Sequence, residues 1–114
     1  MQWRVKDMAD ITIMLVCSAG MSTSLLVSKM QKSAESKGLK AEIFANSANE
    51  ADKTLRSKDV DVLLLGPQVR FMKSQFEKKV VEKNIPVDVI DMRDYGMVNG
   101  EKVLQTALDL LDNE

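Results

Sequence analysis

Histidine is absent from this chain of 114 residues, and cysteine occurs once, at Cys17. Without histidine, any step that needs an imidazole general base or a phosphohistidine must involve another molecule. A single cysteine excludes an internal disulfide, and with no histidine it cannot complete a cysteine and histidine metal site. We therefore expect a cytoplasmic protein that uses neither a metal nor a cofactor.

Long apolar runs and an excess of one charge are also missing. No run approaches the roughly 18 residues of a membrane-spanning helix, and no signal peptide is recognisable. The 16 basic and 17 acidic residues nearly cancel, which disfavours nucleic acid and anionic membranes as partners. The length suits one domain with one core. We assign residues 11–114 to this domain. Residues 1–10 show no regular spacing of apolar residues, and we interpret them as a poorly ordered extension.

Short apolar runs alternate along the chain with helical patterns. The expected strands are residues 11–16, 41–45, 60–65 and 87–90. The expected helices are residues 22–37, residues 46–55, one that opens at residues 66–68 and stops at residues 84–86, and one that begins at Asn99 or Gly100. Residues 91–100 form a loop that can hold one helical turn.

This alternation predicts a single α/β domain with a parallel sheet and helices on both faces. The first and third strands are the most apolar, so we place them centrally, in the order 2-1-3-4 of a flavodoxin-like or phosphatase-like fold. Ligands bind such sheets at the carboxyl ends of the strands, where the order reverses. The loop after the first strand and the loop after the third strand should therefore meet.

The loop after the first strand carries the candidate chemistry. Cys17 is followed by small and hydroxylated residues and then by a helix, so loop amides and the helix N-terminus converge on the thiol. This setting favours the nucleophilic thiolate and then holds a phosphoryl group bound to it. The alternative is an inert buried cysteine, but that role needs neither the glycine nor the hydroxyls. The candidate phosphate-binding residues are Ser18, Ala19, Gly20, Met21, Ser22, Thr23 and Ser24.

Two phosphorus chemistries could use this loop. A cysteine phosphatase places Arg six residues after the cysteine, where its guanidinium clamps the phosphate. Thr23 stands at that position here, so a phosphoryl carrier is favoured and a low-molecular-weight phosphatase-like hydrolase is the alternative.

Three segments carry a family resemblance: CSAGMSTSLLVSKM at residues 17–30, VLLLGPQVRFM at residues 62–72 and PVDVIDMRDYGMVNG at residues 86–100. They resemble the enzyme IIB component of bacterial sugar phosphotransferase systems, in the lactose/cellobiose family and its cellobiose/diacetylchitobiose-like type. The resemblance implies that Cys17 accepts a phosphoryl group from a phosphohistidine of the partner IIA protein. It then passes the group to a β-glucoside-type sugar, of the cellobiose, chitobiose or lactose class, at the membrane component IIC. The sugar itself cannot be read from this sequence.

Residues from the later loops could form the rim of the site or contact a partner. Arg70 could instead be a solvated charge, Asp91 could cap the local turn, and Tyr95 could pack with its hydroxyl in water. The candidate rim residues are Gly66, Pro67, Gln68, Arg70, Asp91 and Tyr95.

Overall fold

The computed structural model describes residues 11–17 and 21–112, and the predicted extension at residues 1–10 lies outside them. The strands are β1 (Ile11–Cys17), β2 (Ala41–Ser47), β3 (Val62–Leu65) and β4 (Val87–Val89). The α-helices are α1 (Met21–Ser36), α2 (Ala48–Ser57), α3 (Lys73–Lys79), α4 (Met92–Gly96) and α5 (Gly100–Asp112). Two 3₁₀ helices, η2 (Pro67–Met72) and η3 (Val81–Lys83), flank α3.

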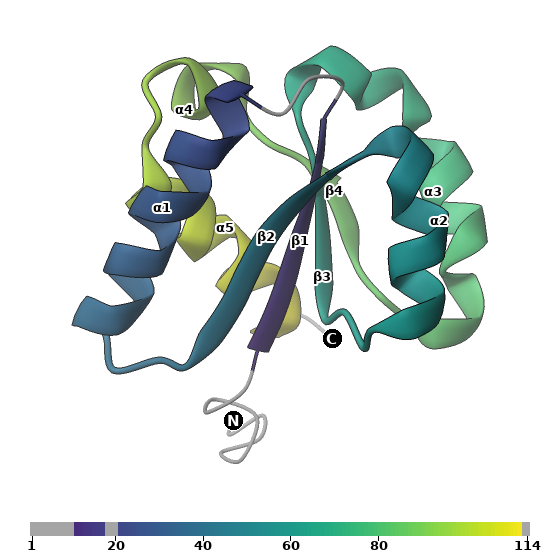
Figure 1. Cartoon of the computed structure of the whole chain (residues 1–114), viewed down its shortest axis with the longest axis horizontal. Helices are drawn as coiled ribbons and strands as arrows, with labels where there is room; N and C mark the ends of the chain where they lie inside the picture. The colour runs from purple at the N-terminus through teal and green to yellow at the C-terminus, as the bar shows by residue number, and fades with distance from the viewer. Residues whose placement is uncertain (1–10, 18–20, 113–114) are drawn as a thin grey trace.

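The four strands form one parallel sheet in the order β2-β1-β3-β4, as the sequence predicted. Strands β1 and β3 are central because nearly all of their side chains are apolar and can be buried on both faces. Strand β4 has only three residues and lies at an edge. Since all strands run in the same direction, their carboxyl ends meet at one edge of the sheet, which is the upper edge in Figure 1.

Helices cover both faces of the sheet (Figure 1). Alternate residues of β1 point to opposite faces, so each face receives its own apolar cluster. The cluster on the α1 and α5 face includes Ile13, Leu15, Leu26, Met30 and Leu104. The cluster on the α2 and α3 face includes Met14, Val16, Leu55, Phe76 and Val80.

The helix predicted after β3 is not continuous. It starts as η2, bends at Val69, where φ is −117° and ψ is 24°, and becomes α3 only at Lys73. Pro67 cannot donate a backbone hydrogen bond, and Val69 turns inward to be buried against the sheet. The prediction of a single helix was therefore wrong, although Val69, Phe76 and Val80, at helical spacing, are all buried.

Candidate active site around Cys17

Cys17 is the last residue of β1, between the ends of β2 and β3, and its side chain is only 1% exposed. Helix α1 begins four residues later and has no acidic residue in its first turn. Unpaired backbone N–H groups at a helix start favour a negative charge placed before them. The geometry therefore suits an anionic group attached to the sulfur.

Part of the predicted phosphate loop is not described. Ser18, Ala19 and Gly20 lie outside the described residues, as do the side chains of Met21 and Ser22. The remaining two predicted loop residues, Thr23 and Ser24, lie in the first turn of α1.

Thr23 contacts the sulfur directly. Its hydroxyl donates a hydrogen bond to Cys17 Sγ over 2.9 Å, and its side chain is 1% exposed. The Tyr95 hydroxyl, from α4, lies 3.4 Å from Thr23 Oγ1. A chain of hydroxyl groups therefore runs from Tyr95 through Thr23 to the thiol. This links a predicted rim residue to the predicted loop across 72 positions of sequence.

Gly66 brings the end of β3 against the same cysteine. Its backbone N–H donates to the Val16 carbonyl over 2.8 Å. A Cβ at this position would lie 3.4 Å from Cys17 Cβ and 2.8 Å from Gln68 Oε1. The absence of a side chain at Gly66 thus leaves room for the Gln68 side chain to fold back over Gly66.

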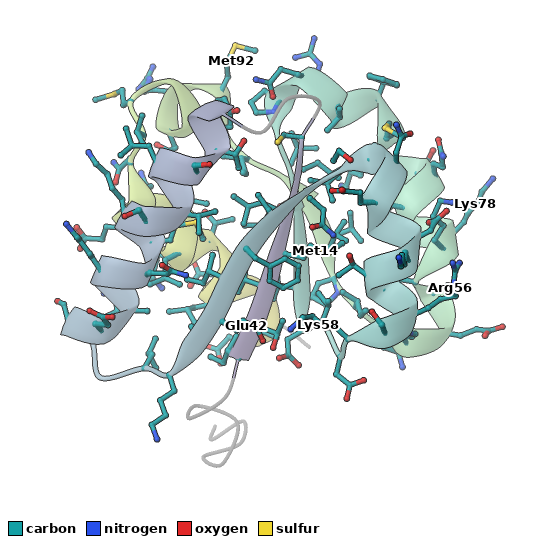
Figure 2. The ribbon with its side chains drawn as sticks, in the orientation of Figure 1. Met14, Glu42, Arg56, Lys58, Lys78 and Met92 are labelled. Atoms are coloured by element: carbon teal, nitrogen blue, oxygen red, sulfur yellow. The ribbon has the colours of Figure 1, made fainter. Side chains whose placement is uncertain are left out.

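The other rim residues divide between a hollow and a helix cap. Asp91 caps α4, because its Oδ1 accepts from the backbone N–H groups of Arg93 and Asp94 over 2.8 and 3.3 Å. Met92 protrudes at the end of the molecule where β1 finishes (Figure 2). A hollow of about 610 Å³ joins the loop after β3 to α4, and its lining residues are Pro67, Gln68, Arg70, Phe71, Met92, Tyr95 and Gly96.

A second hollow, of about 560 Å³, includes Cys17 itself and was missed by the sequence reasoning. It lies on the β2 side of the site, where Ser47 pairs with Cys17 across the sheet. The predicted strand order already placed the end of β2 beside Cys17, and the hollow could have been predicted from that order. The lining residues are Cys17, Ser24, Val27, Ile43, Phe44, Ala45, Asn46, Ser47 and Glu50.

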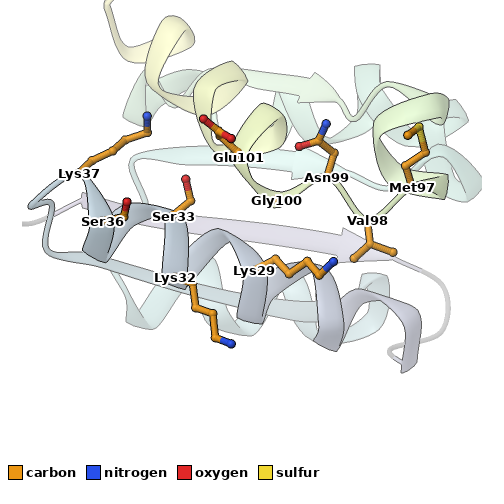
Figure 3. Close-up of a pocket in the computed structure, with 10 residues that line it drawn as sticks. All are labelled: Lys29, Lys32, Ser33, Ser36, Lys37, Met97, Val98, Asn99, Gly100 and Glu101. Carbon is orange, nitrogen blue, oxygen red and sulfur yellow. The ribbon is translucent and has the colours of Figure 1, made fainter.

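A third hollow, between α1 and the start of α5, has an entirely different lining. Figure 3 shows Ser33 and Lys37 of α1 pointing toward the segment that leads into α5, whereas Lys32 points away from it. Within residues 11–17 and 21–112, no group of three potential metal-ligating side chains occurs. In the same residues no helix is both long and apolar enough to cross a membrane.

Known proteins match nearly the whole chain. A family model described as "PTS system, Lactose/Cellobiose specific IIB subunit" matches residues 12–106. The galactose-specific and cellobiose-specific EIIB components of two Lactococcus lactis strains are each 55% identical to this chain, over 92% of this chain and all of theirs. The oligo-β-mannoside-specific EIIB component of Bacillus subtilis is 47% identical, over 90% of this chain and 97% of its own.

Two solved structures have the same fold. The cellobiose-specific IIB component of Borrelia burgdorferi is 43% identical, with a TM-score of 0.73 over 92% of this chain and 94% of its own. The lactose-specific IIB domain of Streptococcus pneumoniae has a TM-score of 0.77 over 88% of this chain and 96% of its own, but only 15% identity, and so it shows the fold alone. The resemblance to the cellobiose-like type is thereby confirmed. The chain belongs to the lactose/cellobiose-specific IIB family of the sugar phosphotransferase system, whose members are protein-phosphohistidine–sugar phosphotransferases.

Proposed function

We propose that Cys17 is the residue that carries the phosphoryl group. The observation that carries this assignment is the contact between the Thr23 hydroxyl and Cys17 Sγ, at the end of a central strand and directly before α1. An inert core cysteine needs no hydrogen-bond donor from a buried hydroxyl, whereas a nucleophilic sulfur does.

The transfer takes place in two displacements. In the first, the Cys17 thiolate attacks the phosphorus of a phosphohistidine on the partner IIA protein whose other ring nitrogen is protonated; the S–P bond forms, the P–N bond breaks, and the neutral imidazole leaves. In the second, a sugar hydroxyl oxygen attacks the same phosphorus; the hydroxyl proton passes to a base, the O–P bond forms, the S–P bond breaks, and the sulfur is again a thiolate. The acceptor sugar is held by the membrane component IIC, so the IIB protein works in the cytoplasm and transiently at the inner face of the membrane.

Residues 18–24 form the phosphate cradle in this proposal. Their backbone N–H groups and the start of α1 hold the phosphoryl oxygens, as in other loops between a strand and a helix. Gly66 and Gln68 line the β3 side of the cradle, since a Gly66 Cβ would sit against both Cys17 and Gln68. Tyr95 supports Thr23 from the outside.

The transported sugar is proposed to be of the β-glucoside type, in the cellobiose, chitobiose or lactose class. The cellobiose-specific relatives support this class, whereas the names of two other relatives specify galactose and oligo-β-mannosides, so members of the family differ in their sugar. A phosphatase-like hydrolase has no such support, since Thr23 occupies the place of the phosphate-clamping arginine and binds the sulfur instead.

Intact-mass measurement tests the assignment. Wild type and Cys17→Ser are incubated with phosphoenolpyruvate, the general phosphotransferase proteins and a cellobiose-type IIA protein. We expect one phosphoryl group on the wild type and none on Cys17→Ser, which keeps its fold because the two side chains are nearly isosteric. Full sugar phosphorylation by Cys17→Ser would refute the assignment, and hydrolysis of an aryl phosphate by the wild type would favour the phosphatase.

A further inference from the structure

The hollow on the β2 side of Cys17 holds a carboxylate that the two displacements have not used. The hollow is about 560 Å³ in volume, within the usual range for small-ligand sites. Its lining combines the aromatic ring of Phe44 with the polar side chains of Ser24, Ser47 and Glu50. An aromatic surface beside hydroxyl and carboxylate groups suits the mixed apolar and polar faces of a sugar.

Glu50 is held close to the strand that neighbours Cys17. It lies in the first turn of α2, and its Oε1 accepts a hydrogen bond from the Ser47 backbone N–H over 3.4 Å. Ser47 is the register partner of Cys17, and neighbouring strands lie about 4.8 Å apart. The exposed Glu50 carboxylate is therefore tethered to the end of the strand that pairs with β1, and it lines the same hollow as Cys17.

The second displacement requires an acceptor for a proton. A sugar hydroxyl that bonds to phosphorus must lose its proton, and this chain has no histidine to take it. Asp91, the acidic residue predicted at the opposite rim, already accepts two backbone hydrogen bonds at the start of α4. Glu50 lines the hollow that contains the sulfur and makes one long bond to a backbone N–H.

We propose that Glu50 is the general base for transfer from phosphocysteine to the sugar, and that the hollow receives the sugar hydroxyl. The proposal rests on the function proposed for Cys17. The hydroxyl proton passes to the Glu50 carboxylate while the O–P bond forms, the S–P bond breaks, and Cys17 leaves as a thiolate. Glu50 then releases the proton to water. The first displacement has no hydroxyl proton to remove and does not need Glu50.

The Glu50→Gln variant distinguishes a role of Glu50 as a base from a purely structural role. Glutamine keeps an acceptor oxygen for the Ser47 N–H and remains a good partner in a helix cap, so a purely structural role predicts no change. Loss of the base leaves donation from IIA within about twofold of wild type but slows transfer to the sugar at least ~tenfold. Glu77→Gln is the matched control, because Glu77 is an exposed carboxylate on α3.

The two steps are measured separately by rapid quenching. Radiolabelled IIA protein gives the rate of Cys17 labelling. Membrane vesicles that contain IIC then give the rate of label loss to whichever of cellobiose, lactose or a β-mannoside the wild type uses fastest. Normal labelling with slow loss in Glu50→Gln alone supports the base. Unchanged loss, or equal slowing of both steps, overturns it. Failure of wild-type Cys17 to take any label would instead overturn the function proposed for Cys17.

Discussion

Thr23 is the residue that distinguishes this site from an ordinary strand end. Its hydroxyl is buried and lies between a sulfur acceptor and the Tyr95 hydroxyl. Buried hydroxyl groups need partners, and here the partner is the sulfur that we propose as the nucleophile. In that proposal, the hydrogen bond holds the sulfur in place and stabilises negative charge on it.

Removing this hydroxyl should slow the chemistry and leave the protein folded. We expect Thr23→Val to reduce the rate of Cys17 phosphorylation about tenfold, because a hydrogen bond to a charged group contributes roughly 1.5 kcal/mol. Valine has nearly the same shape, so the free energy of unfolding should fall by no more than about 1.5 kcal/mol. Rapid-quench labelling measures the first quantity and urea unfolding the second.

Thr23→Ser is the control for that variant, because it keeps the hydroxyl and removes only a methyl group. It should be phosphorylated at close to the wild-type rate. Labelling of Thr23→Val as fast as Thr23→Ser would show that the hydrogen bond to Cys17 Sγ does not contribute to transfer.

The sequence singled out candidate residues for this site, but it did not predict their contacts. Cys17 and its loop stand out because small and hydroxylated residues separate an apolar strand from a helix. Thr23 was predicted to bind phosphate, yet its bond to sulfur depends on the angle between β1 and α1, which no local pattern encodes. Glu50, which we propose as a base, was not predicted, because it lies in the first turn of a polar helix and joins the hollow of Cys17 only through the pairing of β2 with β1.

Helices α1 and α5 pack closely through one glycine. A Cβ on Gly100 would lie 2.6 Å from the backbone carbonyl carbon of Lys29, closer than any real contact of this kind. Figure 3 shows Gly100 facing α1 beside Lys29. The first residue of α5 therefore has to be glycine for the two helices to keep this separation.

Gly100→Ala should destabilise the protein by about 1 to 3 kcal/mol, because the methyl group meets backbone that cannot move aside without shifting α1. Gly96→Ala is the matched control in the neighbouring helix, where a Cβ would meet nothing within 4 Å. It should be neutral or stabilising by up to about 1 kcal/mol. Chemical denaturation compares both variants with wild type, and equal stability of the two would contradict the packing argument.

Helices and strands whose apolar residues recur at a regular spacing could be predicted from the sequence. Segments whose backbone is set by packing could not. Gly38, with a left-handed φ of +75°, follows the end of α1, and Ala51 and Leu55 are the buried residues of α2. The segment after β3 has the same apolar spacing as a long helix. Its backbone nevertheless tightens into η2 because Val69 must reach the sheet right after Pro67.

The molecule has two apolar layers separated by its sheet. Residues of β1 alternate between them, so each layer is built by a different pair of helices. Parallel sheets covered on both faces depend on both layers for stability. Val103, on α5, belongs to one layer and Val80, at the end of α3, to the other, and each is 1% exposed.

This arrangement predicts additive losses when both layers are weakened. Val103→Ala and Val80→Ala should each lower the free energy of unfolding by about 1 to 3 kcal/mol, from lost burial and the cavity left behind. The double variant should lose the sum to within about 0.5 kcal/mol, because the two side chains share no packing partner in these clusters. Urea unfolding followed by circular dichroism and by amide exchange measures the three variants.

A single transition with additive midpoint shifts fits one cooperative unit stabilised from both faces. A coupling energy above about 1 kcal/mol would mean that strain passes through the sheet from one layer to the other, and the ends of β1 and β3 around Cys17 would then respond to substitutions in either layer.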